Sequence, residues 1–411
     1  MPGTSTTTTS APPRSVPPGV AKGDRRDAPE GGSTYSDAGC SAPTDGVPER
    51  ALGGRGVVLS GLPDTMPAAV YRRPGVVEVE QRPVPRPGPG EVLVEVDHCG
   101  ICGSDVHLLL DGWAGRPGLV AGHEYTGSVA ALGPGVDGWT TGDPVVGGPS
   151  PRCGRCRRCL EGKPSQCEQQ GSVVDNSDGA FAGFVLARAA SLVPRPPQLT
   201  SRQAALAEPL AVALHGITRS GVAPGDSVMV VGAGPIGALS IAALVARGIG
   251  PVVAVEPGGR RQQLARDLGA AEVLHPDDLQ TFPAWEPERM AEGAVHVVLE
   301  CSGRKSAMEA GFNQLRRGGT LALVGAGVDQ PSFDPNRFIL NELSVVGSFV
   351  YDDGGFGDAL ALLADPSFPT DLLIEAGDVA LEGISEALVG LAEGRLAGKV
   401  MVAPRRAGGP R

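Results

Sequence analysis

Short runs in which hydrophobic and polar residues alternate begin near Met66. The stretches MPAAVYRRPGVVEVEQRPVP and GEVLVEVDHCGICGSD are rich in β-branched residues and are separated by Pro and Gly. Alternation with a period of two, interrupted by such residues, is typical of antiparallel strands joined by tight turns. The sequence therefore predicts a mostly β region at the start of the ordered chain.

The pattern changes near residue 200. SRQAALAEPLAVALHGIT (201–218) has the apolar spacing of a helix, and VAPGDSVMVVGAG (222–234) reads as a turn followed by a buried strand. From there to about residue 346, wholly apolar strands alternate with Ala- and Leu-rich helices, which predicts a doubly wound parallel sheet. The last 60 residues are mixed and end in GKVMVAP (398–404), which we expect to be a final strand.

These changes predict an α/β protein with a discontinuous first domain. The mostly β region covers 66–209 and 347–405, and it is split by the doubly wound region at 210–346. Residues 1–65 contain Ser, Thr, Pro, Gly and charge without hydrophobic periodicity, so we expect a disordered N-terminal extension. Residues 406–411 form a short tail.

Composition and charge exclude several classes of protein. The 411 residues are enough for two to three domains, and 41% are hydrophobic. A formal net charge of −11 gives no basic patch, so we expect no nucleic-acid partner. The N-terminus has no apolar stretch of a signal peptide, and no apolar run approaches the ~18–20 residues that span a bilayer. We therefore expect a cytoplasmic protein without a membrane partner.

Four of the eight cysteines lie in CGRCRRCLEGKPSQC, which runs from residue 153 to residue 167. They are Cys153, Cys156, Cys159 and Cys167. Two-residue gaps between successive thiols allow them to meet at one ion, and four thiolates make a closed, tetrahedral zinc site of the structural kind. Disulfides or free thiols are the alternative, but the chain is much longer than disulfide-rich domains usually are.

A glycine motif opens the doubly wound region. Gly232, Gly234 and Gly237 have the G-x-G-x-x-G spacing, directly after a strand and at the start of a helix. The first glycine permits a tight turn, the second a close approach of a pyrophosphate, and the third close packing of helix and strand. Glu256 ends the next strand, where a carboxylate can accept hydrogen bonds from the adenosine ribose. The motif predicts dinucleotide binding.

The choice between NAD and NADP depends on the residues after that strand. Glu256 favours NAD, because the 2′-phosphate of NADP would meet its carboxylate. Arg260 and Arg261 could instead hold that phosphate, or they could be solvated charges on a helix face. We expect NAD.

A second group of polar residues that could bind a metal or carry a proton follows the strand that ends near residue 100. In chain order it comprises Cys102, Ser104, Asp105, His107, His123, Glu124 and Glu208. One thiolate, one imidazole and one carboxylate are the three protein ligands of an open, catalytic zinc site. The dinucleotide motif follows 24 residues after Glu208, which couples a redox cofactor to a metal.

With these motifs, the sequence resembles the zinc-dependent medium-chain dehydrogenase/reductase family, the alcohol and polyol dehydrogenases, over residues 66–405. The resemblance implies a GroES-like catalytic domain, including a zinc lobe at 150–168, split by a Rossmann domain. It implies that Cys102 and His123 ligate a catalytic zinc. Glu208 matches the third ligand of the polyol branch, and Glu124 matches a carboxylate that binds zinc or lies just behind it. The residues leave open which glutamate ligates at rest.

The resemblance also assigns roles around the metal and the cofactor. Asp105 would orient the zinc histidine, and Ser104 and His107 would carry the proton of the alcohol to solvent. Ile236, Glu256 and Arg261 match positions that contact NAD in the polyol branch. Two zinc ions per chain are implied, one catalytic and one structural. Relatives form dimers or tetramers, so a homo-oligomer is expected.

The leading hypothesis is a zinc-dependent, NAD-linked enzyme that interconverts a secondary alcohol, polyol or cyclitol and its ketone, or a primary alcohol and its aldehyde. One alternative is a zinc-independent quinone or enone reductase of the same fold. A second is a non-catalytic protein that binds NAD and zinc. We expect Trp113 to border the substrate pocket, and Cys99, His98 and His215 to be packing residues rather than ligands.

Overall fold

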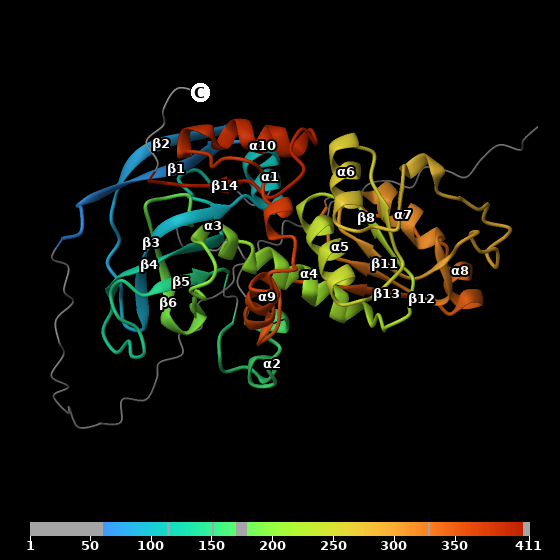
Figure 1. Ribbon diagram of the computed structural model, residues 1–411, viewed down its shortest axis with the longest axis horizontal. Helices are drawn as coiled ribbons and strands as arrows, with labels where there is room; N and C mark the ends of the chain where they lie inside the picture. Colours follow the sequence, from blue (N-terminus) through green and yellow to red (C-terminus); the bar gives the residue numbers. More distant parts are fainter. Residues whose placement is uncertain (1–60, 113–115, 150–151, 170–178, 328, 406–411) are drawn as a thin grey trace, which may run out of the picture. The chain divides into compact units, whose positions relative to one another are not determined.

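The computed structural model describes residues 61–112, 116–149, 152–169, 179–327 and 329–405 (Figure 1). Three predictions fall wholly or largely outside these residues: the disordered extension, of which only 61–65 are described, the tail at 406–411, and the placement of Trp113. The first strand of the described residues begins at Thr65, one residue before the start predicted for the β region.

The first part of the chain is built from antiparallel strands, as the alternating pattern predicts. Strands β1 and β2 form a two-stranded sheet, and a second sheet has the order β14-β3-β4-β5-β7, with β6 paired to β3. These strands are β1 (Thr65–Arg73), β2 (Val76–Pro83), β3 (Glu91–Gly100), β4 (Glu124–Leu132), β5 (Pro144–Gly147), β6 (Phe184–Arg188), β7 (Val193–Pro194) and β14 (Met401–Val402). Their inward-facing side chains form one hydrophobic core, to which residues near the C-terminus also contribute.

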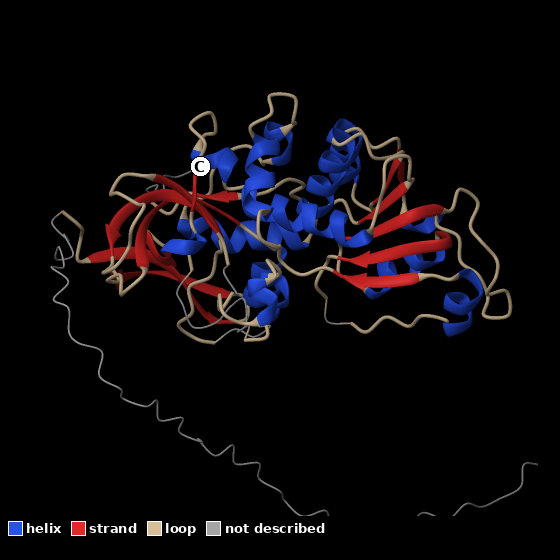
Figure 2. Ribbon diagram, turned by 90° about the horizontal axis from the view of Figure 1, so that it is seen from below, coloured by secondary structure: helices blue, strands red, loops and turns tan. Residues whose placement is uncertain are grey.

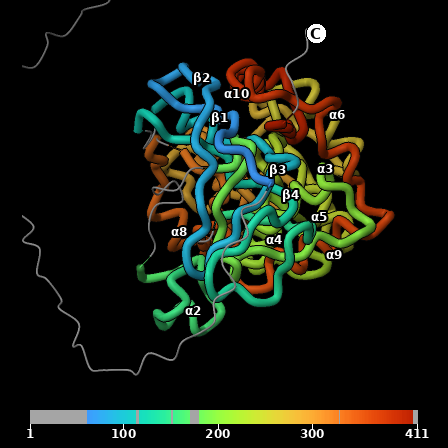
Figure 3. Tube along the Cα trace, turned by 90° about the vertical axis from the view of Figure 1, so that its left-hand side faces the viewer, coloured from blue at the N-terminus to red at the C-terminus, as the bar shows by residue number. Residues whose placement is uncertain are grey.

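The chain returns to this sheet at its C-terminal end. Strand β14 pairs antiparallel with β3, with Met401 opposite Gly100. Helix α10 (Ile384–Ala392) contacts β2, and Figure 3 shows it in red beside β1 and β2 in blue. This pairing has the connectivity expected of a discontinuous domain, although the exact boundaries stay a prediction.

The middle of the chain forms a six-stranded parallel sheet with the order β10-β9-β8-β11-β12-β13. The strands are β8 (Val228–Val231), β9 (Val252–Val255), β10 (Glu272–Leu274), β11 (Val295–Glu300), β12 (Leu315–Leu323) and β13 (Ser344–Gly347). In chain order this is 3-2-1-4-5-6, the order of dinucleotide-binding doubly wound sheets. Figure 2 shows these strands in red as a group separate from the strands of the first region.

Helices connect and cover the sheets. The longer ones are α4 (Ala207–Ser220), α5 (Pro235–Ala246), α6 (Gly259–Asp267), α7 (Lys305–Asn313), α8 (Pro335–Asn341) and α9 (Gly355–Leu363). The shorter ones are α1 (Gly103–Val106), η1 (His107–Asp111), α2 (Arg157–Leu160), η2 (Pro164–Gln166), η3 (Ala189–Ser191), α3 (Ser201–Ala204), η4 (Pro276–Asp278), η5 (Thr370–Leu373) and η6 (Leu381–Gly383). Helix α4 packs against β4 of the first region and against α5 and β12 of the second, so it joins the two sheet regions.

The segment 201–218 differs from its pattern in one respect. It folds as two helices, α3 and α4, rather than as one. Pro209 has no N–H and cannot bond to the carbonyl four residues earlier, but it is tolerated in a first helical turn. The helix therefore restarts just before the proline. No helix among the described residues is long and apolar enough to cross a membrane.

Candidate active site

Strand pairing brings the sequence-predicted ligands together. Gly100, the last residue of β3, lies opposite Glu124, the first residue of β4. Cys102 follows the end of β3 by two residues, and His123 directly precedes β4, so the antiparallel register places them side by side. The thiol of Cys102, the imidazole of His123 and the carboxylate of Glu124 each offer an atom within 4.8 Å of the others. These three residues form what we call the Cys–His–Glu cluster.

Asp105 contacts two members of the cluster, Cys102 and His123. Its Oδ2 accepts a hydrogen bond from the backbone N–H of Cys102 at 2.9 Å, and its Oδ1 lies 3.7 Å from Nδ1 of His123. Burial raises the pKa of Asp105, and His123 opposes that rise. Burial would lower the pKa of His123, but Asp105 and Cys102 raise it well above its usual value. Asp105 is therefore positioned to orient the imidazole.

Glu124 is held from one side by a lysine that the sequence analysis did not single out. Lys399 Nζ lies 2.7 Å from Glu124 Oε1, and both side chains are at most 1% exposed. The same Nζ donates to the backbone carbonyl of Ile101 at 3.1 Å. The sequence held one signal for it: in GKVMVAP a single lysine directly precedes an apolar run, residues 400–402, which the structure buries.

The other carboxylate oxygen of Glu124 supports a cation site. Oε2 is buried and has no hydrogen-bond partner. A Cβ on Gly100 would lie only 2.2 Å from this oxygen, so the glycine leaves the space that the carboxylate occupies. A buried carboxylate with one unpartnered oxygen, grouped with a thiol and an imidazole, is a donor set that suits zinc. The residues present fit the metal.

Glu208 is near this cluster but does not belong to the group of mutually close ligand atoms. It lies in the first turn of α4 and is 3% exposed. Burial raises its pKa to about 8; His123 opposes the rise and Glu124 adds to it. The charges of His123 and Glu124 thus act on this carboxyl, and Glu208 stays a candidate ligand.

Ser104 and His107 follow Cys102 on consecutive helical turns. Ser104 lies in α1, and His107 begins η1, a short π-helix of the kind that often occurs at functional sites. Nδ1 of His107 is 2.8 Å from Oδ2 of Asp111, and the imidazole is 32% exposed. The imidazole therefore reaches solvent, which a terminal proton carrier requires. The relay itself stays a prediction.

The glycine motif has the geometry that its spacing predicts. Gly232 has a φ of +89°, and a Cβ there would lie 2.8 Å from Ser302 Cβ. A Cβ on Gly237 would lie 1.8 Å from the carbonyl oxygen of Gly232, so only glycine permits this turn. Gly234 is the N-cap of α5, which begins with Pro235, and the N-terminus of such a helix suits a phosphate.

Glu256 follows β9 and is buried. Its Oε2 accepts from the N–H of Ala233 at 2.9 Å, and its Oε1 accepts from the N–H of Gly258 at 3.0 Å. The carboxylate thus stabilises the glycine turn through Ala233, and it lies at the end of β9, where the motif predicts the ribose. Ile236 is half-buried in α5. Their contacts with a cofactor stay predictions.

Both arginines after β9 are engaged by the C-terminal part of the chain. Arg261 donates to the carbonyls of Leu391 at 2.8 Å and Leu396 at 3.3 Å. Arg260 pairs with Glu375 at 3.2 Å. The guanidinium carbon of Arg261 lies 3.9 Å from the Cβ position of Gly234, so Arg261 also adjoins the N-terminus of α5.

The four clustered cysteines converge as their spacing predicts. Their sulfur atoms all lie within 4.8 Å of one another, and the seven described cysteines are free thiols. Backbone N–H groups of Arg155 and Cys156 lower the pKa of Cys153 to about 6, whereas burial raises that of Cys159 to about 11. We call residues 152–169 the cysteine lobe. It is tied to the segment after β13 by the pair Arg152–Asp353, 2.7 Å apart.

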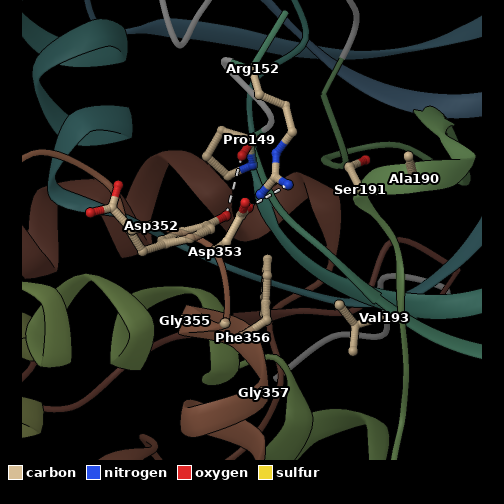
Figure 4. A pocket seen from close by; sticks show the side chains of 12 residues that line it. Pro149, Arg152, Ala190, Ser191, Val193, Asp352, Asp353, Gly355, Phe356 and Gly357 are labelled. Atoms are coloured by element: carbon tan, nitrogen blue, oxygen red, sulfur yellow. Dashed lines mark hydrogen bonds and ion pairs between the residues drawn. The ribbon is translucent and has the colours of Figure 1, made fainter. Parts of the chain in front are cut away.

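A cavity of about 180 Å³ lies beside the cysteine lobe (Figure 4). Tyr351 and Phe356 line it, and the Tyr351 hydroxyl donates to the carbonyl of Pro149 at 3.2 Å. The Arg152–Asp353 pair also lines it, and no residue of the Cys–His–Glu cluster does. A Cβ on Gly148 would lie 2.8 Å from both Glu208 Cγ and the Tyr351 hydroxyl. The cavity is therefore close to Glu208 but separate from the proposed metal ligands.

The remaining candidates have local partners. His98 contacts Ser201 at 2.8 Å and Asp378 at 3.4 Å, and Nδ1 of the buried His215 is 4.0 Å from Asp352. Cys99 is fully buried, and burial raises its pKa well above that of a free thiol. These environments fit packing roles.

Comparison with known proteins identifies relatives of both regions. Residues 88–197 match the alcohol dehydrogenase GroES-like domain, and residues 235–365 match the zinc-binding dehydrogenase domain. Sorbitol dehydrogenase of Bacillus subtilis is 33% identical over 301 residues, which is 71% of this chain and 84% of that protein.

Two solved structures have the same fold. 2R,3R-butanediol dehydrogenase of Bacillus subtilis superposes with a TM-score of 0.71 and 29% identity, covering 83% of this chain and 100% of that one. A zinc-binding dehydrogenase of Sinorhizobium meliloti, solved with NADP, gives a TM-score of 0.73 and 28% identity over the same shares.

The fold and the site together define a nicotinamide-dependent oxidoreductase of alcohols or polyols. The chain belongs to the zinc-type medium-chain dehydrogenase family. The predictions of family, fold class and enzyme class are confirmed, as are zinc and NAD(P) as the types of cofactor. Its substrates are small-molecule alcohols or ketones.

Proposed function

We propose that this protein oxidises a secondary alcohol, polyol or cyclitol to its ketone with NAD, at a zinc held by Cys102, His123 and Glu124. The observation that supports this most directly is the unpartnered Oε2 of Glu124, buried in a cluster whose other members are a thiol and an imidazole. The zinc-independent alternative has no use for such a set of donors.

The residues around the cluster have distinct tasks in this proposal. When bound, zinc supplies a Lewis acid that lowers the pKa of a hydroxyl. Asp105 fixes the His123 ring through its 3.7 Å contact with Nδ1 and holds the backbone at Cys102. Ser104 and His107 carry the released proton to solvent, which the partly exposed His107 imidazole reaches. The buried Glu208 is a further carboxylate for the metal.

The cofactor site supports NAD over NADP. Glu256 is buried at the end of β9, where the 2′-phosphate of NADP would meet a carboxylate. Arg260 and Arg261 are already bonded to Glu375 and to two carbonyls, so neither is a vacant phosphate ligand. Gly232, Gly234 and Gly237 would carry the pyrophosphate at α5.

The test is NADH formation from a panel of secondary alcohols, polyols, cyclitols and primary alcohols, with NAD and NADP in parallel. Activity with at least one secondary alcohol is expected, with NAD preferred by roughly tenfold or more, about 1.4 kcal/mol. Dialysis against a strong chelator should abolish it, and added Zn²⁺ should restore it. NAD-linked turnover that survives loss of all zinc would contradict the proposal.

The same proposal extends to assembly and location. Strand β13 is an edge of the parallel sheet, and Ile339 and Leu340 on the preceding α8 are 72% and 52% exposed. An edge strand beside exposed apolar side chains favours pairing with a second copy, as expected for a homodimer or homotetramer. A site that depends on thiolates at Cys102 and in the cysteine lobe suits a reducing compartment, and we assign the protein to the cytoplasm.

A further inference from the structure

Lys399 is the only lysine among the described residues that is fully buried, and its charge faces the Cys–His–Glu cluster. Its backbone is fixed on both sides, because its N–H donates to Leu373 and its carbonyl accepts from Glu375. Val400 continues this connection by accepting from the N–H of Ile101 at 3.0 Å. The ammonium group is thus delivered to one place by the C-terminal strand.

At that place the ammonium joins the two segments that carry the proposed ligands. It reaches Oε1 of Glu124 at 2.7 Å, at the start of β4, and the carbonyl of Ile101 at 3.1 Å, next to Cys102. Oε1 is occupied by this contact, and Oε2 is left without a partner. The lysine therefore determines which of the two carboxylate oxygens is available.

Stability alone does not explain this pair. Removing two charges from water is unfavourable, and apolar residues of the same volume often replace a buried pair without loss of stability. The pair also requires a glycine at position 100, because a side chain there would overlap the carboxylate of Glu124. A buried pair with one unpartnered oxygen is more readily understood as part of a ligand site.

We propose that Lys399 is a positioning residue of the catalytic metal site, which holds Oε1 of Glu124 so that Oε2 faces the metal. This inference rests on the proposed function, because it takes zinc to lie at Cys102, His123 and Glu124. Partners of metal ligands typically contribute about 10- to 100-fold to metal affinity. The ammonium also repels a nearby dication, so the expected effect is a net value.

The experiment measures zinc affinity at the cluster by competition with a chromophoric chelator, in Lys399→Met and wild type. We expect Lys399→Met to weaken binding there by about tenfold or more. The cysteine lobe should keep its zinc and so report that the variant is folded. The matched control is Lys305→Met, which removes an exposed lysine 3.9 Å from Glu309 and should leave both sites unchanged.

Two further measurements separate positioning from a merely structural role. Co²⁺ placed in the cluster should show altered d–d and thiolate charge-transfer bands in Lys399→Met, because the carboxylate coordinates differently. In a Glu124→Gln background, Lys399→Met should change metal affinity by less than about twofold, because contacting residues that act together are not additive. If Lys399→Met alone fails to fold, this second comparison carries the test, since the double variant removes both buried charges.

The outcomes distinguish the inference from the function on which it rests. If the wild type binds zinc only in the cysteine lobe, the proposed function fails and this inference fails with it. Unchanged affinity and an unchanged Co²⁺ spectrum in Lys399→Met, with a wild type that needs zinc, overturn the inference alone. A full tenfold loss that persists in the Glu124→Gln background also overturns it.

Discussion

The Cys–His–Glu cluster and the cysteine lobe both gather metal-binding side chains within 4.8 Å, but the chain builds them in opposite ways. The lobe takes four thiols from fifteen consecutive residues, in a turn with two short helices. The cluster takes its members from the ends of β3 and β4 and is held by a lysine from the C-terminal segment. The lobe is a local site, and the cluster is a product of the whole β region.

That difference has a chemical consequence. Four thiolates fill a tetrahedral ion, so the lobe has no position for a substrate. Three donors leave a position open, and three further buried ionisable residues, Asp105, Glu208 and Lys399, accompany the cluster. We therefore expect the cluster to control catalysis and the lobe to control stability.

The largest effect is expected for Cys102→Ala. Loss of the thiolate should lower kcat/KM by on the order of 10³-fold or more, because several kcal/mol of transition-state stabilisation depend on the metal. NAD binding, followed by quenching of protein fluorescence, should change by less than about twofold, since the glycine turn is built elsewhere. Turnover within tenfold of wild type would remove the cluster from the catalytic role.

During metal removal, the cluster and the cysteine lobe should lose their zinc at different times. We expect a chelator to remove one zinc per chain together with all activity while the melting temperature changes little, because the cluster has an open position. The second zinc should leave later, with a fall in melting temperature. Zinc analysis, NADH formation and thermal melting on the same time points check this. A single phase in which both properties are lost together would break the distinction.

Cys159→Ser should have a moderate effect of the opposite kind. Its thiol is one of four donors, so the lobe should lose its metal and the melting temperature should fall by roughly 5 °C, on the order of 2 kcal/mol. The kcat of the folded fraction at low temperature should stay within about twofold of wild type. An unchanged melting temperature and oligomer size would show that the lobe contributes neither stability nor assembly.

The smallest effect is expected for Cys99→Ala, a control within the cluster's own neighbourhood. Cys99 is three residues from Cys102 and mimics a metal-binding pair, but it is fully buried and lies opposite Tyr125 in the sheet. Loss of its sulfur should cost about 1 kcal/mol of stability by leaving a small void. Zinc content and kcat should be unchanged. Loss of one zinc would mean that the ligand set is wrong.

The prediction from sequence was strongest where residues act through local spacing. The cysteine lobe and the glycine turn follow from distances of two to seven residues along the chain, and the structure forms both. Alternating apolar and polar positions likewise predict the antiparallel strands, and wholly apolar runs predict the strands of the parallel sheet. It was weaker for the helix at 201–218, which the structure divides at residues 205–206, just before a proline in the first turn of α4.

Residue types alone named every member of the Cys–His–Glu cluster but left the carboxylate undecided between Glu124 and Glu208. The antiparallel register decides which one joins the thiol and the imidazole, because it places Glu124 opposite Gly100. Lys399 is separated from Glu124 by 275 residues and was missed, since no spacing links them. Their contact exists because β14 returns to β3.

The sequence by itself therefore determined the fold class, the cofactor turn and the local thiol site, because hydrophobic period and short-range spacing are written along the chain. Only the tertiary structure decided which carboxylate oxygen is left for a metal and what holds the other one. Strand register sets which residues lie opposite each other, and burial raises the free-energy cost of an unpartnered charge. Both depend on segments that are far apart in the chain.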